Sequence, residues 1–169
     1  MLVTREADYA LRCVLAVAEL GRTSAAAVAR VEGISPSFLG KIVHSLARSG
    51  ILTTRRGVGG GIALARSPQD ITLLQVIEAV GGPLAISECI LSPDSCGHLD
   101  GCPAYPYLCD AQDRLRESLD VSLLTILDRR DGGETGGTTA LRSREGAGNG
   151  RARKRPAVRA SGPSKEGGA

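Results

Sequence analysis

The chain has 169 residues, of which 42% are hydrophobic and 2% aromatic, and its formal net charge is +3 at pH 7. This length allows one ordinary core, built from aliphatic side chains because tryptophan is absent. The sequence has no run of about 18 apolar residues and no basic-then-apolar leader, so we expect a soluble protein of the cytoplasm. Structural disulfides are uncommon there, and grouped cysteines indicate metal or redox chemistry.

The charged residues divide the chain into two parts. Residues 22–66 carry seven basic side chains against one acidic side chain, a balance of +6. Residues 70–128 carry two basic against ten acidic side chains, a balance of −8. A basic part followed by an acidic part indicates a surface that meets a polyanion, although ordinary solvated surface charge gives the same pattern.

The N-terminal part predicts three helices, over residues 4–20, 25–32 and 36–49. Apolar side chains recur there at helical spacing, and a serine or threonine that can cap each helix stands at its start. Pro36 occupies the first position of the third helix, where its missing N–H costs nothing. Two helices joined by a tight turn that contains Gly33 are typical of a helix-turn-helix.

The outward face of the third helix carries small polar and basic side chains. Small residues near the start of a helix permit close approach to base edges, and basic residues further along can reach phosphates. We expect this face to bind DNA through Ser35, Ser37, Gly40, Lys41, His44 and Arg48.

Residues 51–65 predict a β-hairpin, with two strands around a turn of five residues that include four glycines. Beside a helix-turn-helix such a hairpin is a wing. We expect Arg55, Arg56, Gly59 and Gly60 to contact a groove of the DNA. A phosphate-binding loop is the alternative for the glycines, but no Walker lysine follows and the next segment is a strand.

The predicted chain has four parts and a mainly α fold with a small β-hairpin. A fourth helix completes a winged helix-turn-helix domain over residues 1–83, and a cysteine-rich loop covers residues 84–104. Residues 105–130 form a long amphipathic helix and a last apolar turn, whose leucines either pair with a second subunit or fold back on their own domain. Residues 131–169 are rich in glycine, with eight basic and four acidic side chains, and predict a disordered basic tail that attracts DNA or only adds solubility.

Four of the five cysteines lie in one segment with the spacing C-x6-C-x5-C-x6-C. Proline, glycine, serine and aspartate between them allow several thiols to converge. Zinc sites typically have pairs separated by about two to four residues, which counts against zinc. A thiol–disulfide switch remains open. Cys13 stands apart in the first helix, where we expect an inert core thiol.

Catalysis is not expected. The sequence has no paired carboxylates and no nucleophile–base set, and its two histidines are His44 and His98. We expect His44 to face DNA rather than to act as a base.

Four blocks of sequence resemble the IscR, NsrR and RirA family of bacterial winged-helix regulators, over about residues 1–130. The blocks are TREADYALR at 4–12, RGVGGGIALAR at 56–66, DITLLQVIEAV at 70–80 and the cysteines that follow. The resemblance implies a homodimer linked by the long helix, and operator DNA bound by the third helix and the wing. It also implies a transcription regulator, expected to be a repressor, that responds to nitric oxide, redox state or iron supply.

The resemblance further implies an iron–sulfur cluster held by three cysteines, with 4Fe-4S favoured over 2Fe-2S. Matched position by position, these ligands fall on Cys89, Cys96 and Cys102, and Pro103 follows the last of them as it commonly does in the family. Three thiolates leave one ligand position of a four-coordinate site open.

The fourth ligand differs among the relatives that the sequence resembles. IscR-like proteins have a histidine three residues after the third cysteine, where this chain has Tyr105. NsrR-like proteins use an aspartate near the start of the first helix, donated by the other subunit, and Asp8 matches that place. We therefore expect Asp8 as the fourth ligand, with Cys109 and His98 as rivals. A helix-surface ion pair between Asp8 and Arg12 is the alternative for this aspartate.

Overall fold

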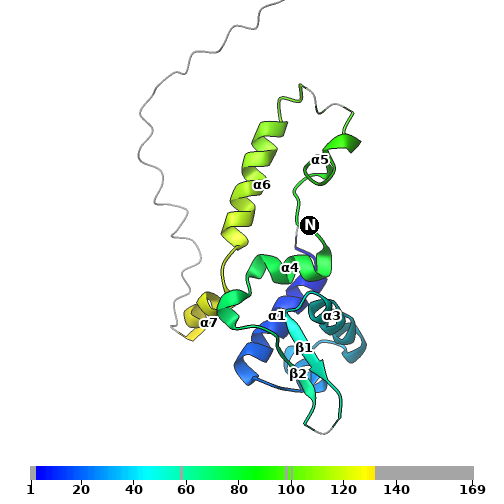
Figure 1. The fold of residues 1–169 in the computed structure, drawn as a ribbon, viewed down its shortest axis with the longest axis vertical. Helices are drawn as coiled ribbons and strands as arrows, with labels where there is room; N and C mark the ends of the chain where they lie inside the picture. The colour runs from blue at the N-terminus through cyan, green and yellow to red at the C-terminus, as the bar shows by residue number, and fades with distance from the viewer. Residues whose placement is uncertain (1–2, 58, 98, 100, 132–169) are drawn as a thin grey trace, which may run out of the picture. The chain divides into compact units, whose positions relative to one another are not determined.

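The structure is a computed structural model that describes residues 3–57, 59–97, 99 and 101–131. The predicted basic tail therefore lies outside the described residues from residue 132 onward. In chain order the elements are α1 (Arg5–Leu20), α2 (Ala25–Glu32), α3 (Pro36–Arg48), β1 (Leu52–Arg55), β2 (Gly61–Leu64), η1 (Pro68–Asp70), α4 (Leu73–Gly81), α5 (Glu88–Leu91), η2 (Pro93–Ser95), α6 (Tyr105–Leu119) and α7 (Leu123–Asp131). These elements confirm the predicted fold class (Figure 1).

Side-chain caps fix the starts of three helices, as the sequence indicates. The Thr4 hydroxyl accepts a hydrogen bond from the Ala7 N–H at 3.2 Å, and the Ser24 hydroxyl does the same for Ala27 at 3.1 Å. Thr72 begins α4 with a complete capping box. Ser35 stands at the N-cap of α3 as expected, but its side chain makes no capping hydrogen bond and is exposed.

Aliphatic side chains from α1, α2, α3 and the hairpin share one core. Val14, Leu39, Ile42, Leu46 and Ile51 are almost completely buried in it. Burial of each such side chain contributes roughly 1.5–3 kcal/mol, so this cluster holds α3 in a fixed orientation on α1. The polar residues of α3 therefore face solvent.

The wing is an antiparallel hairpin anchored on the connection between α1 and α2. Arg55 pairs with Gly61 at its outer end; the first strand is shorter than predicted, and the second has the predicted length but begins one residue earlier. The backbones of Thr23 and Ile62 exchange hydrogen bonds of 3.0 and 2.7 Å. A Cβ atom at Gly61 would fall on the Thr23 carbonyl oxygen, and the φ angle of Gly61 is 134°, so this close approach requires glycine.

The cysteine segment is not wholly irregular, which corrects the prediction of a plain loop. It contains the single helical turn α5 and the 3₁₀ turn η2 before α6 begins. Elements of three or four residues are too short to show helical periodicity in the sequence. Figure 1 shows residues 84–91 leading away from α4 and α6 leading back towards it.

Part of α6 packs on its own domain. Leu115 and Leu119 lie against a small cluster that includes Ala7, Leu74 and Leu84. The apolar stripe of this half of the helix therefore folds back within the chain, which was the alternative to a partner. At the other end of α6, the Tyr107 side chain is 78% exposed.

The last helix is longer than the short turn that the sequence predicts. Leu123, its first residue, is fully buried in the main core. The Leu123 N–H donates to the Ile71 carbonyl, and the Leu73 N–H donates to the Val121 carbonyl, both at 2.9 Å. These bonds fix the C-terminal end of α6 beside the start of α4.

No helix among the described residues combines the length and the hydropathy that crossing a lipid bilayer would need.

Candidate nucleic-acid interface and thiol site

The outer face of α3 carries every side chain that the sequence assigns to it. Because Leu39, Ile42 and Leu46 point into the core, the opposite side of the helix faces solvent. The exposed residues there are Ser35, Ser37, Gly40, Lys41, His44 and Arg48. On the wing, Arg55, Arg56 and Gly59 are exposed and Gly60 is half-buried.

A pocket of about 460 Å³ lies at the start of α3 and is lined in part by α1. Arg5 and Tyr9 contribute from α1, and Lys41 and two serines contribute from the beginning of α3. Among the ion pairs of the described residues, none involves Arg5 or Lys41. Arg5 is not among the residues that the sequence predicts to bind DNA, although its position in the first turn of α1 is unfavourable for a basic residue because of the helix dipole.

One basic residue of the 22–66 segment serves the fold instead. The Arg66 guanidinium donates to the carbonyl oxygens of Gly50 and Asp70, and to the side-chain oxygen of Gln75, at 3.0–3.3 Å. It thus ties the end of the wing to α4, so the charge balance of the segment overstates the charge that is available to a polyanion.

Asp8 lies near the start of α1 with its side chain 58% exposed. The ion pair with Arg12, which was the alternative for Asp8, is present but long, at 3.9 Å. Arg12 instead pairs with the Glu32 carboxylate at 2.9 Å, and it also donates to the Glu32 carbonyl oxygen. Asp8 is therefore only weakly engaged by its neighbour on the helix.

Arg12 also belongs to a small group that reaches α3. Its guanidinium carbon lies 5.5 Å from the centre of the Tyr9 ring, and Tyr9 meets Phe38 edge to face with 5.7 Å between ring centres. Phe38 stands in the first turn of α3, so α1 and the start of the candidate recognition helix are in direct contact.

The four grouped cysteines are free, half-buried thiols on different elements. Cys89 lies in α5, Cys96 directly follows η2, Cys102 lies in the loop and Cys109 lies in the first part of α6. Sulfur ligands are the donor type that iron–sulfur clusters use, so the chemistry of the set fits such a group.

The donor atoms do not converge on one point within the single chain. Within the described part of the chain, no three histidine, cysteine, aspartate or glutamate side chains are grouped closely enough to hold a metal ion. Asp8 is therefore not gathered with the thiols of its own chain. His98, named as a rival ligand, lies outside the described residues.

Two of the thiols affect the pKa of the Tyr105 phenol. A side-chain hydrogen bond with Cys109, followed by the charge of that thiol, raises the pKa of the Tyr105 phenol, and the charge of Cys89 adds a smaller effect. The Ser87 hydroxyl lies 3.2 Å from the Cys89 sulfur. Tyr105 thus interacts mainly with Cys109, which follows it by one helical turn in α6.

The family model for Rrf2, described as an iron-dependent transcriptional regulator, matches residues 3–129. The chain belongs to the Rrf2 family. Rrf2 proteins are DNA-binding transcription regulators, so this chain is a regulator and not an enzyme. The match covers both the winged domain and the cysteine segment.

Individual Rrf2 relatives agree with this assignment. The regulator NsrR of Geobacillus kaustophilus (strain HTA426) is 33% identical over 131 residues, which are 76% of this chain and 84% of that protein. IscR of Pectobacterium atrosepticum is 28% identical over 144 residues, covering 78% and 87%. The structure of CymR, the global cysteine regulator of B. subtilis, superposes with a TM-score of 0.63 at 25% identity, covering 75% of this chain and 95% of that one.

Cys13 differs from the grouped cysteines in its surroundings. It is fully buried in the core, as expected. Burial, with a smaller contribution from the charge of Glu32, raises the pKa of the Cys13 thiol from 9.0 to about 12. The reactive thiolate is therefore nearly absent at neutral pH.

We therefore predict that iodoacetamide alkylates the four grouped cysteines of the reduced, metal-free native protein at least about 100-fold faster than Cys13. Mass spectrometry of peptides after timed labelling measures the rates, and labelling in denaturant is the control because it exposes all five thiols. Native alkylation of Cys13 as fast as that of Cys96 would contradict the buried position.

Proposed function

We propose that this chain is a homodimeric transcription repressor whose binding to operator DNA is switched by an iron–sulfur cluster on the cysteine segment. The observation that carries the proposal is the set of half-buried free thiols at Cys89, Cys96 and Cys102, on a segment joined at both ends to a winged helix-turn-helix domain. The similarity to NsrR and IscR supports it. A bound cluster would supply iron that reacts with nitric oxide or oxygen or is lost when iron is scarce.

Asp8 of the partner subunit is our choice for the fourth ligand, with a 4Fe-4S cluster favoured over 2Fe-2S. Its carboxylate is more than half exposed and only distantly paired with Arg12. In a single chain it does not join the thiols, and a ligand from the second subunit removes this difficulty. Cys109 and His98 are the rivals.

DNA binding is proposed for the outer face of α3 together with the wing. Lys41 and Arg48 can reach phosphates, and the serines at the start of α3 allow the backbone to come close to base edges. Arg55, Arg56 and the glycines at the tip of the wing would lie along a neighbouring groove. In a homodimer the distance between the two α3 helices determines which operator spacing is bound.

A regulator without a cluster, which uses its cysteines as a thiol–disulfide or zinc switch, is the second candidate. Four free, half-buried thiols in one segment favour it, because accessible thiols can be oxidised to disulfides. The similarity to CymR, a cysteine regulator, also supports it. Metal content separates the two candidates.

For the cluster, we predict that protein purified anaerobically absorbs visible light and contains iron and acid-labile sulfide. The Cys96→Ser variant should be colourless because it loses a thiolate ligand, and Asp8→Ala should lose most of its iron. Cys109→Ser is the matched control and should keep its cluster. Colourless wild-type protein with zinc or a disulfide would favour the second candidate, and an intact cluster in Asp8→Ala would exclude Asp8 as the ligand.

For the DNA interface, we predict that Lys41→Ala weakens binding to short duplex DNA of arbitrary sequence. Loss of one phosphate contact should reduce the slope of log affinity against log salt concentration by about 0.9. Fluorescence anisotropy at several salt concentrations measures the slope. Arg114→Ala removes an equal charge from α6, where Arg114 pairs with Asp110 at 2.9 Å, and should change the slope little. An equal loss in both variants would indicate a general charge effect and no contact at Lys41.

A further inference from the structure

Gln112, in the middle of α6, is a buried polar side chain with 5% exposure. Burial of a carboxamide is costly unless its oxygen and its nitrogen both find partners. Here Oε1 accepts a hydrogen bond from the Ile86 N–H at 3.0 Å, and Nε2 donates to the Leu84 carbonyl oxygen at 2.7 Å. A single side chain thus pairs with two backbone groups of one segment, the Leu84 carbonyl and the Ile86 N–H.

The contact lies at the base of the cysteine segment. Ile86 precedes Cys89 by three residues, and Gln112 follows Cys109 by three residues, so all four grouped cysteines lie between the two joined positions. Residues 84–91 lead outward and α6 returns (Figure 1), and Gln112 therefore joins the outgoing arm to the returning arm.

A second polar contact places the same arm against the DNA-binding domain. The Leu84 N–H donates to Oε1 of Glu78 in α4 at 3.0 Å. That oxygen also accepts a hydrogen bond from Arg116, one turn after Gln112, at 2.7 Å. The outgoing arm is therefore held by side chains from both α4 and α6.

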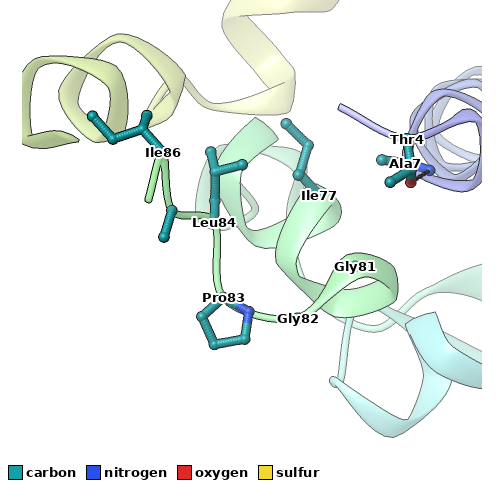
Figure 2. A pocket seen from close by; sticks show the side chains of 9 residues that line it. Thr4, Ala7, Ile77, Gly81, Gly82, Pro83, Leu84 and Ile86 are labelled. Atoms are coloured by element: carbon teal, nitrogen blue, oxygen red, sulfur yellow. Dashed lines mark hydrogen bonds between the residues drawn. The ribbon is translucent and has the colours of Figure 1, made fainter. Parts of the chain in front are cut away.

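Apolar packing also holds this arm through Leu84, which is buried beside Ala7 and Ile77. A pocket of about 400 Å³ lies on one side of it, lined by Thr4 and Ala7 of α1 and by the residues that follow α4. Figure 2 shows the chain passing along the pocket from Gly82 to Ile86, with the α1 residues on the far side. Packing of Leu84 and the directional hydrogen bonds therefore both hold the arm, and the hydrogen bonds select its register.

We propose that Gln112 is the positioning residue of the cysteine segment. Its donor and acceptor match only one register of residues 84–86, because a shift by one residue would turn the backbone groups away from it. An apolar side chain of equal size would fill the space but would not fix the register. The arms that carry Cys89 and Cys109 thereby keep one relative position, whether the thiols hold a cluster or form a disulfide.

The test compares Gln112→Met, which keeps the length and loses both hydrogen bonds, with Asp113→Met on the exposed side of the same turn. Both variants are made in the full chain and studied reduced and metal-free. Hydrogen exchange at the Ile86 amide should become roughly tenfold faster in Gln112→Met, the factor that corresponds to about 1.4 kcal/mol. Iodoacetamide alkylation of Cys89 should also accelerate several-fold, whereas Asp113→Met should match the wild type in both measurements.

A second variant keeps the test decisive if Gln112→Met unfolds. In its ionised form Gln112→Glu retains an acceptor for the Ile86 N–H but has no donor for the Leu84 carbonyl, so at alkaline pH it should preserve amide protection while Cys89 alkylation rises. Unchanged exchange and alkylation in the folded variants would overturn the proposal, as would equal changes in Asp113→Met. Neither measurement involves bound iron, so the role of Gln112 is tested independently of the cluster hypothesis.

Discussion

The Glu78 carboxylate joins the winged helix-turn-helix domain to the cysteine segment. One of its oxygens accepts hydrogen bonds from the backbone of Leu84 and from Arg116, which belong to the outgoing and the returning arm of the cysteine segment. Glu78 itself stands on α4, and α4 packs on α1 and α3. Glu78 therefore joins α4 to both arms of the cysteine segment.

This junction gives the proposed switch a physical basis. The far end of the segment carries Cys96 and Cys102 on short turns, whereas its two arms are fixed by Gln112 and Glu78. Ligands that draw the thiols together would pull on both arms, and the arms connect to α4 through hydrogen bonds. These contacts identify the residues through which a change at the thiols would reach the helices proposed to bind DNA.

The sequence was informative where a residue acts through local rules. Thr4 and Ser24 cap their helices, and the alternation of Leu39, Ile42 and Leu46 with polar residues oriented α3 correctly. It was less informative where a role depends on tertiary contact. Gln112 looks like a surface residue of an amphipathic helix, and Arg66 looks like a free charge, because their partners are backbone atoms far away in the sequence. The packing of Leu115 and Leu119 on their own domain is equally hard to predict, because their partners include side chains far away in the sequence.

We propose that the state of the cysteine segment controls operator binding. The most direct measurement is the affinity of one preparation for an operator selected from a duplex library, before and after anaerobic removal of its cluster. We expect the dissociation constant for the operator to change at least about tenfold at constant salt, which is equivalent to about 1.4 kcal/mol of coupling. Equal affinities of the loaded and the cluster-free protein would contradict it.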